Sequence, residues 1–142
     1  MTLAARTIIP GEGTGEALTL TAPLSLWGGV DPVTGTIVAG HHPERGVVLT
    51  GRVLLIERLV GSSSSAAIML ELIRNCTAPA AVVLGSVDAI LAIGALVGTA
   101  LDYSAPPIVL LEPWPTHPPQ GQLRVTAEGP AHSQALINAT PD

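Results

Sequence analysis

Apolar and polar positions along the chain predict strands in the first half and a mixture of helices and strands after it. Alternating or β-branched segments predict strands at residues 6–9, 16–21, 35–39, 46–57, 80–84, 107–111 and 122–126. The runs 80–84 and 107–111 are uninterrupted and apolar, which is typical of strands buried on both faces. Residues 122–126 alternate strictly, as expected for a strand at a sheet edge. Gly51 interrupts the longest run and predicts a bulge or bend there.

Two segments in the middle of the chain predict helices. Residues 66–75 repeat apolar side chains at helical spacing, and Pro79 prevents any continuation. Residues 87–97 predict a second, short helix that is almost entirely apolar. With hardly any polar face, this helix either lies deep inside the domain or packs against a partner subunit. The predicted fold class is α/β: one compact domain over residues 1–142, with its core at about 6–127, a β-rich front half and two short helices.

Three segments predict irregular structure. Gly11, Gly13 and Gly15 follow Pro10 at alternate positions, but their spacing matches neither phosphate-binding glycine motif and no helical pattern follows. We therefore expect a turn at residues 10–15. Four prolines at residues 112–119 predict a loop, and the pattern weakens after Glu128.

Composition narrows the possible functions. The chain has 142 residues, a net charge of −5, six arginines and no lysine, so it carries no basic patch for nucleic acid or an anionic membrane. A single cysteine excludes an internal disulfide framework and a cysteine-only metal site. No apolar run reaches the ~18 residues of a membrane span, and no targeting segment precedes the first strand. From these features we expect a cytoplasmic protein.

Residues 61–65, which we call the serine loop, have the sequence Gly-Ser-Ser-Ser-Ser and precede the first predicted helix. Four serines are few for a flexible linker and more than a single helix cap needs. A glycine at a helix start can also expose backbone N–H groups and the positive end of the helix dipole to a carboxylate or phosphate. The same field favours a serine alkoxide, the form in which serine acts as a base. The capping and anion-binding interpretations both remain open from the pattern alone.

The remaining reactive side chains form no recognisable motif. His41 and His42 are adjacent, which is poor spacing for one metal ion, and we expect them in a surface loop. Asp31 precedes a proline and by itself indicates a turn. Cys76 at the end of the first helix is expected to be a buried, inert thiol. We predict no metal ligand in this chain.

Three segments taken together resemble a known family. They are residues 23–35 (Pro-Leu-Ser-Leu-Trp-Gly-Gly-Val-Asp-Pro-Val-Thr-Gly), His42-Pro43 with Gly46 and Gly51, and the serine loop leading into Leu70-Glu71-Leu72. Ala78-Pro79-Ala80 and Ile93-Gly94-Ala95 follow in the same order. Over roughly residues 7–112 the chain resembles the small subunit of the aconitase X family, the swivelling β/β/α domain of a two-part dehydratase.

The resemblance implies a partner, a cofactor and an activity. Family members pair this domain with a large catalytic subunit that carries an iron or iron–sulfur centre. Known activities are dehydration of cis-3-hydroxy-L-proline, in bacteria, and of 5-phosphomevalonate, mainly in archaea. Abundant Ala and Pro with arginine in place of lysine are typical of a GC-rich bacterial genome, which favours the hydroxyproline activity. The alternatives are a phosphomevalonate dehydratase small subunit or a non-catalytic binding module.

The resemblance also implies roles for individual residues. Ser62 corresponds to the first serine of the superfamily's Gly-Ser-Ser loop and is expected to be the catalytic base. Binding of a small carboxylate substrate is expected from the surrounding residues Ser63, Gly61, Ser25, Gly28, Gly29 and Asp31.

Two departures from the family pattern bear on these roles. Many members have Gly-Arg-Gly before the serines, whereas this chain has Leu59-Val60-Gly61, with Arg58 nearby. Ser63 also stands where fused hydroxyproline dehydratases tend to have a cluster-ligating cysteine. This chain therefore lacks that ligand, and we expect the metal centre either to differ from that of the fused enzymes or to be held wholly by the large subunit.

Overall fold

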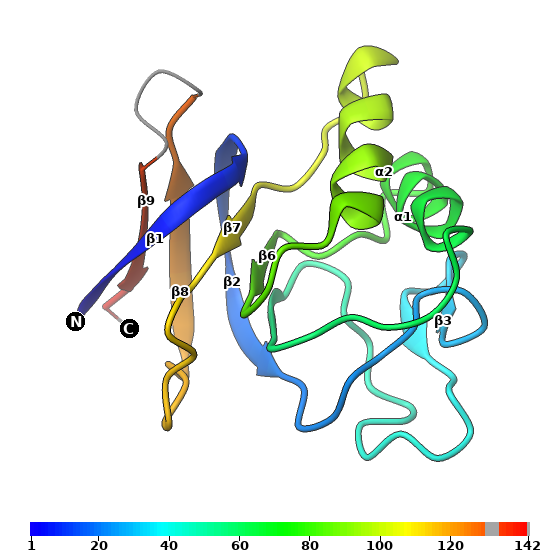
Figure 1. Cartoon of the computed structure of the whole chain (residues 1–142), viewed down its shortest axis with the longest axis horizontal. Helices are drawn as coiled ribbons and strands as arrows, with labels where there is room; N and C mark the ends of the chain where they lie inside the picture. Colours follow the sequence, from blue (N-terminus) through cyan, green and yellow to red (C-terminus); the bar gives the residue numbers. More distant parts are fainter. Residues whose placement is uncertain (130–133, 142) are drawn as a thin grey trace.

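The computed structural model describes residues 1–129 and 134–141. In chain order the elements are β1 Thr2–Ile9, β2 Gly11–Thr19, β3 Val30–Asp31, β4 Thr36–Ile37, β5 Val53–Ile56, α1 Ser65–Arg74, β6 Ala81–Leu84, α2 Ala89–Ala100, β7 Ile108–Leu110, β8 Gln122–Ala127 and β9 Gln134–Ala139. Seven of the strands close into a barrel, and α1 and α2 lie together on one side of it (Figure 1). The expected α/β class, with a strand-rich front and two helices, is confirmed.

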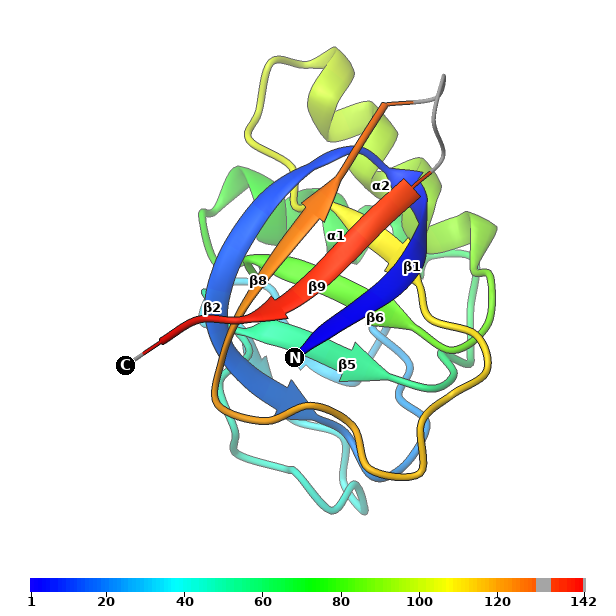
Figure 2. The ribbon, with the colours of Figure 1, turned by 90° about the vertical axis from the view of Figure 1, so that its left-hand side faces the viewer.

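The barrel has a parallel half and an antiparallel half. Its strands are ordered β1-β7-β6-β5-β2-β8-β9. Strands β2, β5, β6 and β7 pair in parallel, and every other pair is antiparallel (Figure 2). The connections through the two helices join β5 to β6 and β6 to β7, as parallel neighbours require. The carboxyl ends of β5, β6 and β7 therefore open at the same edge of the sheet.

Two apolar cores lie on the two faces of the parallel strands. Val53 and Leu55 of β5 point into the barrel, whereas Leu54 and Ile56 pack in the core beneath the helices. Strands β6 and β7 are buried along their whole length, which confirms the prediction for residues 80–84 and 107–111.

Helix α1 follows the predicted pattern and ends in a tight cap. Its buried face contains Ser65, Met69, Leu72 and Ile73. Beyond the helix, Cys76 adopts a left-handed conformation (φ 58°), and the N–H groups of Cys76 and Thr77 bond back to the carbonyl oxygens of Ile73 and Leu72. This geometry turns the Cys76 side chain out to solvent, so the expectation of a buried thiol is wrong.

The glycine-rich segment is a strand and not a turn. Gly11–Thr19 forms β2, which pairs with both β5 and β8. A Cβ atom on Gly13 would overlap the carbonyl oxygen of Ala80, and one on Gly15 would overlap that of Gly51. The glycines therefore serve close backbone approach rather than chain reversal.

Two other strand predictions need correction, and one strand was missed. The run 46–57 contains a strand only over Val53–Ile56, because Gly51 takes a positive φ of 70° and breaks the extended chain. Strand β8 is not at an edge, because β9 covers its second side. Strand β9 itself was not predicted after Glu128. Residues 112–119 form a loop, as expected.

Candidate functional site

The serine loop follows β5 and turns directly into α1. Gly61, Ser62 and Ser63 are exposed, Ser64 occupies the N-cap position, and Ser65 is the first residue of the helix. The Ser64 side chain makes no capping hydrogen bond. The one backbone amide that a serine hydroxyl satisfies here is that of Ser64, which donates to Ser62 Oγ over 3.1 Å.

Most backbone N–H groups at the start of α1 already donate hydrogen bonds to carbonyl oxygens of the loop. The amides of Ser65, Ala66 and Ala67 donate to the carbonyl oxygens of Ser62, Ser63 and Ser64, respectively. Across the described part of the chain, no acceptor faces the amides of Ser62 and Ser63. These two amides can therefore bind an oxygen atom of a ligand, while the helix beyond them is closed to it.

A second segment, residues 25–29, packs against the serine loop. Ser65 Oγ accepts the Trp27 N–H over 3.2 Å, and Ser25 Oγ donates to the Trp27 carbonyl oxygen over 3.0 Å. Gly61 has a φ of 99°, and a Cβ atom there would overlap the Ser25 hydroxyl group. Contact between the two segments thus explains why position 61 is glycine.

The two glycines after Trp27 form the turn that holds this segment in place. Gly28 has a positive φ of 73°, and the Gly29 amide bonds to the Leu26 carbonyl oxygen over 3.2 Å. A Cβ atom on Gly29 would overlap the carbonyl oxygen of Ser25. The structure therefore brings Ser25 beside the serine loop, whereas Gly28 and Gly29 form the turn after it and border a separate hollow with His41 and His42.

Asp31 lies elsewhere. Its carboxylate accepts the Val33 N–H over 2.9 Å, closing a local turn. The carbonyl oxygen of the adjacent Pro32 accepts hydrogen bonds from Asn75 and Thr77, just beyond the carboxyl end of α1. A helix of this length spans about 15 Å, and the serine loop is at its other end. The structure does not bring Asp31 to the serine loop.

The surroundings of Ser62 are weakly charged. Ser62 borders a small hollow of about 100 Å³ that Asp88 also lines. The Asp88 carboxylate is engaged at the start of α2, where it accepts the Leu91 N–H over 2.8 Å. Hydrogen bonding to Arg74 lowers the pKa of the Glu71 carboxyl, but that pair lies in the last turn of α1.

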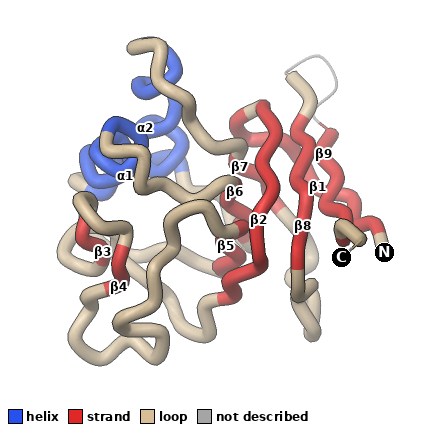
Figure 3. The backbone as a smooth tube through the Cα atoms, turned by 180° about the vertical axis from the view of Figure 1, so that it is seen from behind, coloured by secondary structure: helices blue, strands red, loops and turns tan. Residues whose placement is uncertain are grey.

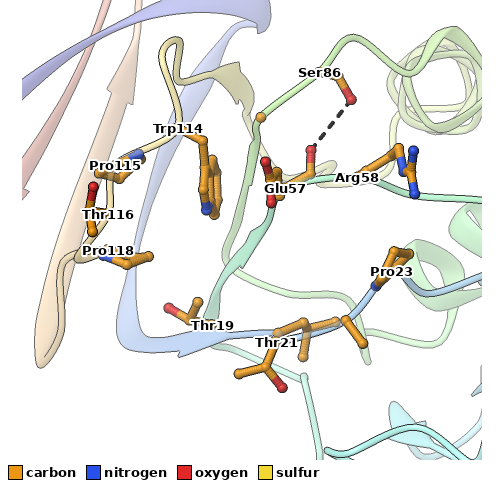
Figure 4. Close-up of a pocket in the computed structure, with 13 residues that line it drawn as sticks. Thr19, Thr21, Pro23, Glu57, Arg58, Ser86, Trp114, Pro115, Thr116 and Pro118 are labelled. Carbon is orange, nitrogen blue, oxygen red and sulfur yellow. Dashed lines mark hydrogen bonds between the residues drawn. The ribbon is translucent and has the colours of Figure 1, made fainter.

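A larger open pocket of about 870 Å³ lies at the carboxyl ends of the parallel strands (Figure 4). Glu57 and Arg58 follow β5, Ser86 follows β6, and Trp114 follows β7. The Ser86 hydroxyl donates to the Glu57 carbonyl oxygen over 3.4 Å. The pocket thus offers a carboxylate, a guanidinium group and an aromatic ring.

Sequence reasoning noted Arg58 and missed the other lining residues. The sequence feature that could have predicted this pocket is the position of Glu57, Ser86 and Trp114, each of which follows a buried apolar run. Ligands of α/β sheets bind outside the carboxyl ends of parallel strands.

The described residues do not fit a metal centre. Within residues 1–129 and 134–141, no three His, Cys, Asp or Glu side chains gather closely enough to hold a metal ion.

His42 lies in a loop, as predicted, but its ring is almost fully buried. Its Nε2 lies 3.0 Å from the Ala22 carbonyl oxygen, and its Nδ1 lies 3.1 Å from the amide of Glu44. His42 therefore has a structural role.

Comparison with known proteins agrees with this arrangement. The family profile described as "Aconitase X swivel domain" matches residues 2–129. The chain belongs to the aconitase X swivel-domain family. The holo-form crystal structure of Thermococcus kodakaraensis aconitase X superposes with a TM-score of 0.80 at 29% identity, covering 98% of this chain and 99% of that one. The resemblance inferred from the sequence is confirmed.

Two curated relatives carry different substrate names. The cis-3-hydroxy-L-proline dehydratase of Pseudomonas aeruginosa is 42% identical over 106 residues, which is 75% of this chain and 18% of that protein. The phosphomevalonate dehydratase small subunit of Methanothermobacter thermautotrophicus is 41% identical over 91 residues, or 64% of this swivel domain and 70% of that subunit. Similar identities to both do not distinguish the two substrates.

No helix in the described residues is long and apolar enough to cross a membrane.

Proposed function

We propose that this swivel domain is the small subunit of an aconitase X-type dehydratase acting on cis-3-hydroxy-L-proline, with Ser62 as the catalytic base. A large aconitase X subunit completes the site and holds the iron or iron–sulfur centre, since the described residues of this chain fit none. The names of the relatives support the dehydratase class and the presence of a larger partner.

The observation that carries the proposal is the environment of the Ser62 hydroxyl. It is exposed on a glycine-led helix start and accepts the Ser64 N–H over 3.1 Å. A backbone donor aimed at this oxygen stabilises negative charge on it, and the positive end of the α1 dipole acts in the same direction. These two effects favour an alkoxide at Ser62 over one at Ser63 or Ser64. Ser65 also accepts a backbone N–H, but it is buried away from any substrate.

The chemistry requires a base beside a carboxylate. In the dehydration, Ser62 takes the proton from the carbon next to the substrate carboxylate, the electron pair forms the new double bond, and the hydroxyl group leaves from the neighbouring carbon as water after gaining a proton. The free amides of Ser62 and Ser63 can donate to the substrate carboxylate and hold it beside the base. An exposed helix dipole contributes only about 0.3–1 kcal/mol, so closure against the large subunit has to supply most of the activation.

The choice of cis-3-hydroxy-L-proline over the phosphorylated alternative is supported by composition. Abundant Ala and Pro, with arginine in place of lysine, are typical of a GC-rich bacterial genome, and the hydroxyproline activity is the bacterial one.

The test uses the complex of this chain with the large subunit. The wild-type complex is expected to turn over cis-3-hydroxy-L-proline and not 5-phosphomevalonate. Ser62→Ala should lower kcat by roughly 10²–10⁴ without preventing complex formation, whereas the matched variant Ser64→Ala should change kcat little. Normal turnover by Ser62→Ala would refute the assignment, and loss of turnover in Ser63→Ala alone would move the base by one position. Preference for 5-phosphomevalonate would refute the substrate.

A further inference from the structure

Helix α2 has two apolar stripes, and only one of them is covered. Leu91, Gly94, Ala95 and Gly98 are buried, and Gly94 and Gly98 lie against α1. Around the helix axis a second stripe contains Ile93, Leu96 and Val97, which are 52%, 55% and 40% exposed. The whole helix contains no charged residue. The first of the two alternatives for this helix, deep burial within the domain, is therefore wrong.

Further exposed apolar side chains border the site of Ser62. Trp27 is 55% exposed and is held to the serine loop by the bond from its amide to Ser65 Oγ. Val60 lines the small hollow beside Ser62 and is 45% exposed. Val87, which directly precedes Asp88 of that lining, is 57% exposed. Exposed groups of this size around a single hydroxyl are typical of a surface that another chain covers.

The helix stripe and the border of the site are continuous. The hollow beside Ser62 is lined from one side by Val60 and Gly61 and from the other by Asp88 and Ile90 of the α2 start. Ile93 lies one helical turn beyond Ile90. We define the apolar face by six residues: Trp27, Val60, Val87, Ile93, Leu96 and Val97. It runs from the serine loop along α2, on the side of the molecule that carries the helices (Figure 3).

We propose that this apolar face is the surface on which the large aconitase X subunit docks. The inference rests on the proposed function, because the chain that covers Ser62 must be the one that completes its site. A second copy seated on this face would bury Ser62 against a surface with the same groups and leave the site incomplete. The absence of charge along α2 fits the apolar centre of a lasting interface rather than its polar rim.

The closed barrel offers a partner no free strand edge. Every barrel strand in the described residues is paired on both sides, so no strand can be added to the barrel. The apolar face offers helix and loop surface instead.

The experiment measures the affinity of the purified large subunit for variants of this chain. Leu96→Arg places a charge at the middle of the face and should weaken binding by about 10- to 100-fold, as expected for an interface centre. Val33→Arg is the matched control, because Val33 is 71% exposed and lies in the β3–β4 connection beyond the far end of α1. Unchanged thermal unfolding of both variants excludes a folding defect.

The outcomes separate this inference from the proposed function. Weakened binding with kcat restored at saturating large subunit supports docking on α2. Equal affinities of Leu96→Arg and wild type, with an active wild-type complex, would overturn the inference and leave the function standing. Failure of wild type to bind the large subunit would overturn both. A wild-type dimer that Leu96→Arg dissociates, with affinity for the large subunit intact, would assign the face to a second copy.

Discussion

Ser62 and Ser65 are separated by less than one helical turn, yet their hydroxyl groups have opposite surroundings. Ser62 is exposed and accepts an N–H from within its own loop, whereas Ser65 is 9% exposed and accepts the Trp27 N–H from another segment. The run of four serines does not itself distinguish these roles, and only the family resemblance singled out Ser62. What the sequence could predict was the loop, its glycine and the helix after it.

Gly29 allows a test of the wall beside the serine loop. Its missing Cβ leaves room for the Ser25 carbonyl oxygen, which is backbone and cannot rotate away. Gly29→Ala should therefore lower the free energy of unfolding by more than the ~1 kcal/mol of an ordinary Gly–Ala exchange. Denaturant unfolding measures the change.

Gly40→Ala is the control for this prediction, because nothing lies within 4 Å of a Cβ placed there. Equal stability of the two variants would show that residues 25–29 can shift away from the serine loop without cost.

At the scale of elements, a helix or strand could be predicted when its own burial determines the order of apolar and polar residues along it. The helices and the fully buried strands β6 and β7 were predictable, because burial on both faces produces continuous apolar runs. The second part of strand β2 was predicted within residues 16–21, but its first part was not. Gly13 and Gly15 there leave room for the carbonyl oxygens of residues 80 and 51, which are distant in sequence. Strand β9 was missed because its alternation is weak and its partners, β1 and β8, include the far end of the chain.

The contact between α1 and α2 makes opposite predictions for two glycines of one helix. A Cβ on Gly94 would lie 2.6 Å from the Ala66 carbonyl oxygen, which is backbone. Gly94→Ala should destabilise the protein by about 1–3 kcal/mol despite the better helix propensity of alanine. A Cβ on Gly98 would meet only side chains, Ile73 at 3.2 Å and Leu70 at 3.7 Å, which can adjust.

Gly98→Ala should therefore leave stability unchanged or raise it by up to about 1 kcal/mol. Thermal unfolding of the two variants side by side provides the measurement. If both variants destabilise equally, the helices are packed as tightly at Gly98 as at Gly94.

At the scale of the whole molecule, the domain is a barrel with helices and the serine loop on one side and the paired ends of β1 and β9 on the other (Figure 1). The class of this fold followed from the sequence, but closure of the barrel did not, since it depends on pairing between β1, β7 and β9. Likewise, the family resemblance placed Asp31 with the other site residues, because Asp31 belongs to the segment 23–35 that carries the resemblance. The fold separates it by the length of α1.

The proposed division of the site between two chains makes a prediction about this chain alone. The purified chain should show no turnover of cis-3-hydroxy-L-proline or 5-phosphomevalonate, because the proposed function gives it the base, and its described residues hold no metal-binding cluster to assist the departing hydroxyl. Adding the large subunit should produce turnover. Activity of the isolated chain, after treatment with a chelator, would contradict the division.

The outward-facing Cys76 has a practical consequence. It is the chain's single cysteine and it is exposed at the end of α1 remote from Ser62. A maleimide dye can therefore be attached at one defined position without mutagenesis and without touching the serine loop or the apolar face. Energy transfer from this dye to an acceptor on the large subunit would report the distance between the two chains as substrate binds.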